Sequence, residues 1–448
     1  MRISTMITLV LAAVFLSANF EINSQKTNSS KRKSNDTISQ SILAVDISKL
    51  KRSQVDAVKT RPEVSWWTEF GDSLVVSGDP GPLEDRLRLE NLSIVSRWND
   101  LTADMLEVAV AAHSEEIPPG RQVLVKSGRL SLLANSQSSR HESIPVSWRF
   151  KLTPFVPNTI YVLSGSVEGR PKIWNQAQFM RAKNVMADVD PVRWYMDVGT
   201  LTNWNRHVSS VDNVSARDWI KNEFDQLRPS NSSLQKFNVM GRDAWNVIAT
   251  FDAGPETDIY IVCGHYDSIS ERPSESAPGA EDNATGAAAV IELARVFAKA
   301  PKSATLVFAT FSGEEQGLVG SKAFVRNLDT TTRSRIKAVL NMDMIGYSKD
   351  DSEDVLLESS SRYKALVDQF AAAASLVAGL KYYVTFNPYG SDHMPFIDAG
   401  IPAILTIDND WGDYPDYHRS SDTIDKVSRD MGAAILRMNA GALAGMLN

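Results

Sequence analysis

Three apolar, partly β-branched runs between residues 259 and 343 each end abruptly in a loop that carries His, Asp or Glu. They read IYIVCGHYDS from Ile259, TLVFATFSGEE from Thr305 and KAVLNMDMIGY from Lys337. Runs of this length and composition are typical of buried strands. Loops at the carboxyl ends of parallel strands meet at one edge of a sheet, so we expect the polar residues to gather there.

Helical patterns alternate with strand patterns through the second half of the chain. Apolar residues recur at helical spacing after Ser215, and a long helix is expected to begin near Thr285. Further helices are expected over 362–378 and 422–447, and further strands over 244–253 and 401–408. This alternation predicts an α/β fold, an α/β/α sandwich with a mostly parallel central sheet.

Six residues with metal-ligand chemistry follow these apolar runs, two imidazoles and four carboxylates. They are His265, Asp282, Glu314, Glu315, Asp343 and His418. Nitrogen and oxygen ligands without thiolate suit zinc in a catalytic site. Two ions need five of these ligands if one carboxylate bridges them, and the remaining carboxylate is then available as a general base.

The order of the motifs from residue 185 to 448 resembles the M28 family of dinuclear zinc aminopeptidases. The motifs are GHYDS, PGAEDNATG, SGEEQGLVGS, NMDMIG, SDHMPF and YHRSSDT, with Thr285 where the family has Ser. The resemblance implies two zinc ions per chain, bridged by Asp282. It also implies a cis peptide bond between Asp282 and Asn283.

The remaining roles that the resemblance implies follow the order of the motifs. His265 and Asp343 complete one metal site, and Glu315 and His418 complete the other. Glu314 is the general base. The loop from Asn387 resembles the family loop beside the substrate pocket, which makes Tyr389, Ser391 and His393 candidate substrate-binding residues.

Two acidic residues stand close to the expected imidazole ligands. Asp267 lies two residues after His265, on the same face of an extended segment, and is expected to orient the imidazole as part of the catalytic machinery. Asp422 is four residues after His418 and is expected to act in the same way there.

The reaction expected from this set is hydrolysis of N-terminal residues from peptides or proteins that have a free N-terminus. Three alternatives stay open: a glutaminyl cyclase with a single zinc, a carboxypeptidase of the same family, and a homologue without catalysis. The last predicts missing ligands, and all six are present. A carboxypeptidase of the kind with an inserted domain before the first ligand is disfavoured, because residues 203–264 are too few to hold one.

The first 22 residues have the pattern of a secretory signal peptide. Arg2 precedes an apolar run from Met6 to Leu16, which is shorter than the roughly 20 residues that span a bilayer. We therefore expect a secreted or periplasmic protein with no stable membrane insertion after signal cleavage. The net charge of −7 argues against nucleic acid as a partner.

Residues 23–184 differ from the rest of the chain in composition and in the pattern of apolar residues. Residues 23–60 are rich in Ser, Lys, Asn and Gln, which predicts a disordered linker or a pro-segment. Residues 61–184 contain short apolar runs separated by Gly, Pro and Asn, which predicts a β-rich N-terminal domain of antiparallel strands. Its role, a removable pro-domain or a permanent accessory domain, is open. The M28-type domain is expected over 185–448.

Overall fold

The computed structural model describes residues 40–111, 120–135, 150–165, 173–299 and 303–447. All of them belong to one compact unit. The predicted signal peptide lies outside the described residues. Among the described residues, no helix combines the length and the apolar character needed to cross a membrane.

Eight strands of a 13-stranded sheet come from the second half of the chain, in the order β10-β11-β13-β12-β14-β17-β15-β16. The four neighbouring pairs β12/β13, β12/β14, β14/β17 and β15/β16 are parallel. The strands are β10 (Asn231–Val239), β11 (Arg242–Phe251), β12 (Ile259–His265), β13 (Thr305–Phe311), β14 (Ile336–Met342), β15 (Asp354–Ser359), β16 (Lys381–Thr385) and β17 (Ala403–Asp408). The predicted α/β fold is confirmed, but the sheet as a whole is mixed, with three successive parallel pairs linking β13, β12, β14 and β17.

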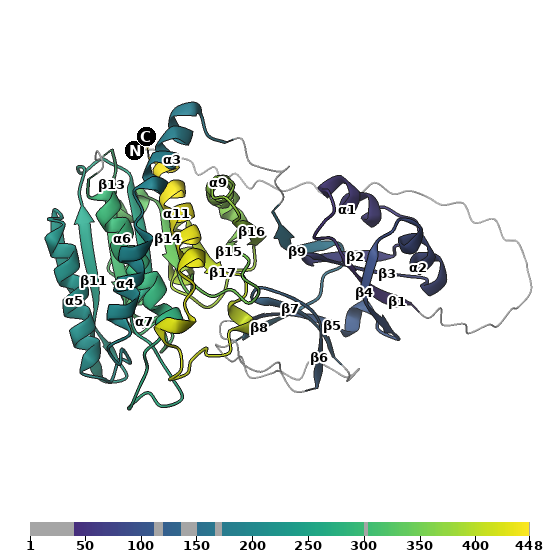
Figure 1. The fold of residues 1–448 in the computed structure, drawn as a ribbon, viewed down its shortest axis with the longest axis horizontal. Helices are drawn as coiled ribbons and strands as arrows, with labels where there is room; N and C mark the ends of the chain where they lie inside the picture. The colour runs from purple at the N-terminus through teal and green to yellow at the C-terminus, as the bar shows by residue number, and fades with distance from the viewer. Residues whose placement is uncertain (1–39, 112–119, 136–149, 166–172, 300–302, 448) are drawn as a thin grey trace, which may run out of the picture. The chain divides into compact units, whose positions relative to one another are not determined.

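Helices pack against both faces of this sheet (Figure 1). Side chains alternate along β12, so that Tyr260 and Val262 belong to the core under one set of helices while Ile261 and Cys263 belong to the core under the other. The first set is α4 (Pro191–Leu201), α5 (Asp212–Gln226), α6 (Thr285–Phe297), α9 (Lys364–Ala374) and α11 (Arg429–Met446), and the second is α7 (Val319–Arg326) and α10 (His393–Asp398). Helix α3 (Gln176–Ala187) packs on α11.

The last helix begins later than the sequence predicts. A helix was expected from residue 422, but α11 starts at Arg429 because the Ser428 side chain accepts a hydrogen bond from the Met431 N–H and caps the helix. Residues 422–428 instead form a loop with one short 3₁₀ turn, Ile424–Lys426. This loop leaves Asp422 free of helical constraints beside the candidate site.

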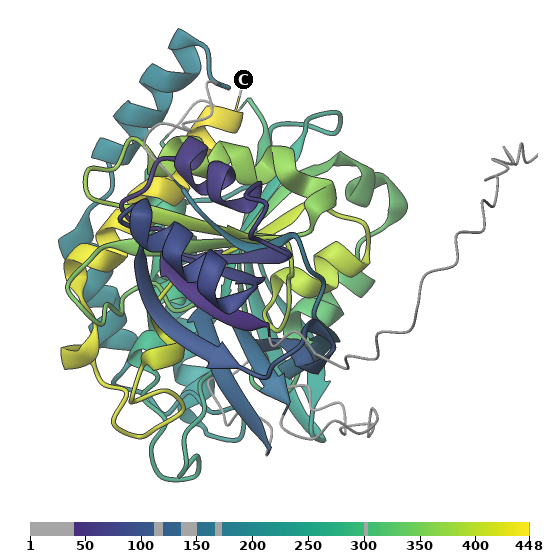
Figure 2. The same ribbon diagram turned by 90° about the vertical axis from the view of Figure 1, so that its right-hand side faces the viewer.

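The sheet continues past β16 into the N-terminal region, in the order β16-β9-β2-β3-β1-β4. Figure 2 faces the first part of the chain, drawn in purple and dark blue. These strands are β1 (Ser41–Asp46), β2 (Trp66–Gly71), β3 (Ser73–Gly78), β4 (Ser93–Asn99) and β9 (Thr159–Ser164). Helices α1 (Arg52–Lys59) and α2 (Pro80–Leu89) accompany them. A separate sheet has the order β6-β7-β5-β8 and comprises β5 (Leu106–Ala111), β6 (Arg121–Ser127), β7 (Leu130–Asn135) and β8 (Phe150–Pro154).

Residues 41–46 and 52–59, which lie in the segment 23–60 predicted as a disordered linker or a pro-segment, form regular secondary structure and not a disordered linker. The pro-segment alternative stays a prediction. Residues 41–46 form β1, which is hydrogen-bonded on both sides, to β3 and to β4, and is almost wholly buried. Helix α1 buries only Val55 and Val58, so its sequence resembles that of a solvated segment. The boundary expected between residues 184 and 185 stays a prediction.

Candidate metal centre

The six candidate residues come from loops at one edge of the central sheet. His265 is the last residue of β12, and Asp343 directly follows β14. Glu314 and Glu315 lie in the loop after β13, and Asp282 lies in the turn before α6. His418 belongs to the long loop after β17, where its backbone has a positive φ of 54°.

The structure brings five of these side chains into two clusters that share Asp282. In the first, His265 Nε2 lies 3.2 Å from Asp343 Oδ1 and 3.3 Å from Asp282 Oδ1. In the second, His418 Nε2 lies 3.1 Å from Asp282 Oδ2 and 3.1 Å from Glu315 Oε2. The two oxygens of Asp282 therefore face different clusters.

Glu314 belongs to neither cluster. It lines a cavity that is also lined by the three residues of the first cluster. This cavity is bounded by Arg129, His265, Asp282, Glu314, Asp343, Met344, Gly390, Ile407, Trp411 and Tyr417. Burial raises the pKa of Glu314 well above its ordinary value, and the nearby charge of Asp343 adds to this rise. A carboxylate in such surroundings has a greater affinity for a proton than one in water.

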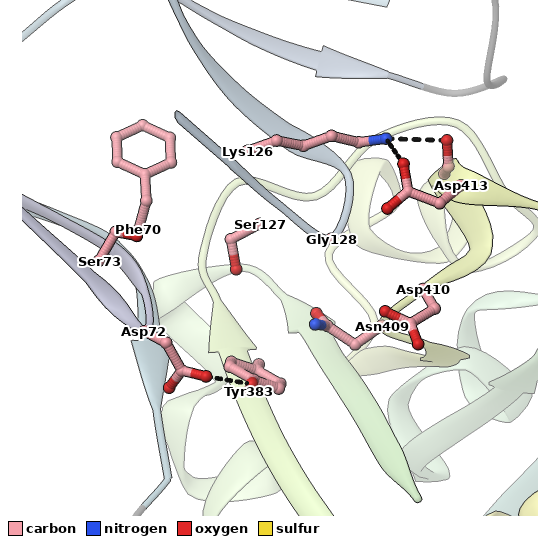
Figure 3. Close-up of a pocket in the computed structure, with 11 residues that line it drawn as sticks. Phe70, Asp72, Ser73, Lys126, Ser127, Gly128, Tyr383, Asn409, Asp410 and Asp413 are labelled. Carbon is pink, nitrogen blue, oxygen red and sulfur yellow. Dashed lines mark hydrogen bonds and ion pairs between the residues drawn. The ribbon is translucent and has the colours of Figure 1, made fainter. Parts of the chain in front are cut away.

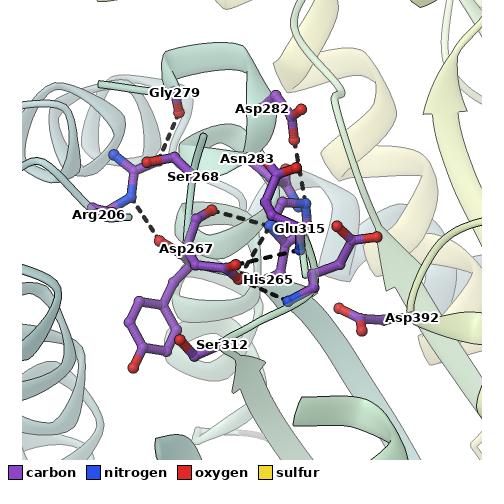
Figure 4. Close-up of polar contacts among 12 residues, drawn as sticks. Arg206, His265, Asp267, Ser268, Gly279, Asp282, Asn283, Ser312, Glu315 and Asp392 are labelled. Atoms are coloured by element: carbon purple, nitrogen blue, oxygen red, sulfur yellow. Dashed lines mark hydrogen bonds and ion pairs between the residues drawn. The ribbon is translucent and has the colours of Figure 1, made fainter. Parts of the chain in front are cut away.

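Asp267 holds the loop that carries both glutamates. Its carboxylate oxygens accept the backbone N–H groups of Glu314, at 3.2 Å, and of Glu315, at 3.3 Å (Figure 4). The His265 ring faces this residue as well, with Nδ1 3.1 Å from the Asp267 carbonyl oxygen and 3.6 Å from its Oδ1. Asp267 thus connects the imidazole of one cluster with the backbone of the Glu314–Glu315 loop.

Asp422 holds the turn that carries Asp282, rather than the His418 ring as the sequence suggested. Its carboxylate accepts the backbone N–H groups of Glu281, at 2.9 Å, and of Asp282, at 3.1 Å. The Tyr414 hydroxyl donates to the same carboxylate at 2.7 Å. The cis peptide bond implied by the resemblance is confirmed between Asp282 and Asn283.

Arg206 lies beneath the site and was missed by sequence reasoning. Its guanidinium is fully buried and donates to the carbonyl oxygens of Leu201, Tyr266, Pro278 and Gly279. In Figure 4 dashed lines join it to Gly279 and to the backbone next to Asp267. No ligand motif marks a residue that acts through backbone carbonyls, so no local signal in the sequence could have found it.

The residues present fit a bound divalent cation at each cluster. Glu315 is 3 % exposed, and its Oε1 makes no hydrogen bond among the described residues. Burial, together with the charge of Asp282, raises the pKa of Glu315 to about 7. A buried anion of this kind needs a compensating charge or a proton, and carboxylate oxygens with imidazole nitrogens are donors that zinc accepts.

The loop around Ser391 touches the metal centre from the side of Asp343. The Ser391 hydroxyl donates to Asp343 Oδ2 at 2.6 Å and accepts from Asn341 Nδ2 at 2.8 Å. His393 is fully buried, with Nε2 3.2 Å from Glu358 Oε1, and the Tyr389 N–H donates to that same oxygen at 2.9 Å. The substrate-binding roles expected for these three residues stay predictions.

The part of the chain that holds the candidate centre is similar to a known family. Residues 246–443 match the family described as peptidase family M28. We call these matched residues the M28 region. The M28 region contains all six residues of the candidate centre.

Curated relatives of the M28 region include named peptidases. The chain is 31 % identical over 179 residues to aminopeptidase YwaD of Bacillus subtilis, covering 39 % of this chain and 38 % of that protein. It is 29 % identical over 229 residues to leupeptin-inactivating enzyme 1 of Streptomyces exfoliatus, covering 45 % and 48 %. The chain thus spans less than half the length of these relatives.

The fold is also that of a solved structure. The LapA aminopeptidase of Legionella pneumophila superposes with a TM-score of 0.55, at 18 % identity, over 77 % of this chain and 98 % of that one. At this identity the likeness concerns the fold alone. The coverage extends beyond the M28 region.

Proposed function

We propose that this protein is a secreted, zinc-dependent aminopeptidase that hydrolyses N-terminal residues from peptides or proteins at a dinuclear site. The match of the M28 region to a peptidase family supports hydrolysis of peptide bonds. The names of the relatives, an aminopeptidase and several probable zinc metalloproteases, support zinc and attack from the amino end.

The observation that carries the dinuclear assignment is the position of Asp282. Its Oδ1 faces His265 and its Oδ2 faces His418, so one carboxylate can serve a ligand set on either side. Paired ions about 3.5–4 Å apart are a common arrangement in aminopeptidases. In this proposal His265 and Asp343 would hold one ion, while Glu315 and His418 would hold the other.

Bound zinc would supply Lewis-acid chemistry, polarising the scissile carbonyl and lowering the pKa of a water molecule. Glu314 lies in the same cavity and would accept the proton of the attacking water, then pass it to the leaving amine. Burial raises the pKa of Glu314, which increases its affinity for the proton that it would accept. Asp267 fixes the backbone of Glu314, so the carboxylate starts from a defined position.

The side chains around the cavity favour an apolar first residue in the substrate. Met344, Ile407, Trp411 and Tyr417 line it beside the carboxylates. Phe311, Phe396 and Ile401, which are apolar residues of neighbouring segments, lie in a core cluster instead.

The test combines metal analysis with a substrate panel. The purified protein should hold about two zinc equivalents, lose activity on chelation and regain it when zinc is restored. Aminoacyl p-nitroanilides with a free α-amino group should be hydrolysed, and their N-acetylated counterparts should not. Full activity with one ion would contradict the dinuclear site, and cyclisation of N-terminal glutamine without hydrolysis would indicate a glutaminyl cyclase.

A further inference from the structure

A hairpin of the N-terminal region reaches the cavity of the M28 region. Strands β6 and β7 are joined by the two residues Gly128 and Arg129. Arg129 is 3 % exposed and lines the cavity together with His265, Glu314 and Asp343. Its position in the sequence, 136 residues before His265 (265 − 129), gives no sign of this contact.

The tip of this hairpin is docked closely on the M28 region. Gly128 has a positive φ of 52°, and a Cβ there would lie 2.9 Å from Asn409 Oδ1 and 3.0 Å from Leu356 Cδ2. Beside it, Lys126 Nζ donates to the Gly412 carbonyl at 2.8 Å and to Asp413 Oδ1 at 3.0 Å (Figure 3). The hairpin therefore has little freedom to move away from the loop after β17.

The Arg129 side chain is held on its own side by the neighbouring strand β5. Its Nε donates to the Ala111 carbonyl at 2.9 Å, and the Ala111 N–H donates back to the Arg129 carbonyl at 2.9 Å. The guanidinium also lies over the Trp411 ring, 5.4 Å from its centroid. These contacts aim the guanidinium across the boundary between the two sheets.

On the far side the guanidinium contacts the segment 387–391. Arg129 Nη2 donates to the Gly390 carbonyl at 2.9 Å, and Nη1 lies 3.5 Å from Glu358 Oε1. Glu358 is fully buried and accepts the Tyr389 N–H through that same oxygen. The residues on either side of the Tyr389–Gly390 peptide are thus fixed by one buried ion pair.

The next residue along this segment touches the candidate metal ligand. Ser391 donates to Asp343 Oδ2 at 2.6 Å, which leaves Asp343 Oδ1 facing His265. Ser391 and Glu358 are fully buried, so water is poorly placed to substitute for a lost contact. A shift of Gly390 would therefore move the hydroxyl that sets the orientation of Asp343.

We propose that Arg129 is a positioning residue of the metal centre, which it acts on through Gly390, Ser391 and Asp343. This inference rests on the proposed function for the metal itself, and goes beyond it in assigning a role to the N-terminal region. The β6–β7 hairpin is then a permanent part of the active site. Removing the N-terminal region would impair the enzyme rather than activate it.

The experiment compares full-length variants at Arg129 with a matched control on the same hairpin. Arg129→Met keeps most of the side-chain length but removes the charge and the donors. Arg129→Lys restores the charge but not the planar set of donors. The control is Arg121→Met, at an arginine of β6 that pairs with Glu107, 2.6 Å away and outside the cavity.

The readouts are cobalt(II) binding, followed by visible absorption, and separate values of kcat and KM. Arg129→Met should weaken one of the two cobalt sites by about 10–100-fold, and kcat should fall over a similar range. KM should stay close to that of the wild type, because the substrate is not the contact that is lost. Arg129→Lys should recover part of both losses, and Arg121→Met should match the wild type.

Ser391→Ala provides a second route if Arg129→Met fails to fold. It removes the hydroxyl next to Asp343 without touching the hairpin, so it should weaken the same cobalt site. Wild-type cobalt affinity and kcat in a folded Arg129→Met protein, or in Ser391→Ala, would overturn the inference. A rise in KM alone would also overturn it, because Arg129 would then contact substrate. A wild-type protein that binds no metal would instead overturn the proposed function.

Discussion

Glu314 and Glu315 are adjacent and chemically alike, yet their side chains have different surroundings. Glu315 Oε2 lies 3.1 Å from His418 Nε2 and belongs to a metal-ligand cluster. Glu314 lines the cavity and lies outside both clusters. Asp267 fixes the backbone of both, so the difference is in the direction of the side chains.

This difference predicts opposite outcomes for two identical substitutions. Glu314→Gln keeps size and hydrogen bonding but removes the base, so kcat should fall by about 10²–10⁴ while zinc content stays near two. Glu315→Gln removes an anionic ligand, so zinc content should fall together with the rate. Metal analysis and initial rates on the same preparations decide this. Zinc lost in the Glu314 variant and retained in the Glu315 variant would reverse the assignment.

At the level of residues, the sequence was informative where ligands follow strands. His265, Asp343 and the glutamate pair could be found because each stands at the end of an apolar run. Arg129 and Arg206 could not, because they act on backbone carbonyls of segments far away in the chain. The role of Asp422 was also mistaken, since it contacts the backbone at Asp282 and not the nearby His418.

The start of helix α6 determines where Asp282 lies relative to strand β14. Asn283 Nδ2 donates to the Met342 carbonyl at 3.0 Å, and its Oδ1 accepts the Gly286 N–H at 2.8 Å. The helix can approach this closely because residue 286 has no side chain. A Cβ at Gly286 would lie 2.3 Å from the Met342 carbonyl oxygen and 2.4 Å from Asn283 Oδ1.

Gly286→Ala should therefore damage stability and metal binding together. The added methyl group forces α6 away from β14, which we expect to cost about 1–3 kcal/mol in free energy of unfolding and to weaken zinc binding. Gly199→Ala in α4 is the matched control, since its Cβ would meet one atom, Ile424 Cγ1, at 3.9 Å. Alanine is favoured there by about 0.5–1 kcal/mol. Urea unfolding and zinc titration measure both effects, and wild-type behaviour of Gly286→Ala would contradict the close approach.

At the level of elements, buried strands were easier to predict than short, half-exposed ones. The expected helix near Thr285 corresponds to α6, and the strand expected over 401–408 corresponds to β17. Strand β1 was missed because its six residues follow a long polar stretch, and its burial depends on pairing with β3 and β4, which lie later in the chain. Such non-local pairing is not visible in local composition.

At the scale of the whole molecule, the N-terminal region and the M28 region share a hydrophobic core. One cluster contains Val75, Leu130 and Tyr161 from the first part together with Leu356, Tyr383 and Trp411 from the second. Strand β9 pairs with β16 on one side and with β2 on the other, so the backbone hydrogen bonds also cross from one region to the other. Separating the two regions would expose this apolar surface to water.

Two independent domains, as a boundary at residues 184 and 185 implies, should unfold in two steps, whereas a shared core should couple them into one. We expect a single transition, in which amides of β1 and β14 lose protection together in hydrogen exchange. Leu130→Ala lies in the N-terminal region and Leu356→Ala in the M28 region. Both leucine side chains belong to the shared cluster and are fully buried. Each should lower the free energy of unfolding by about 2–5 kcal/mol and shift that one transition. If Leu130→Ala shifted the exchange of β1 and left β14 unchanged, the shared core would not couple the regions, and the predicted boundary would hold.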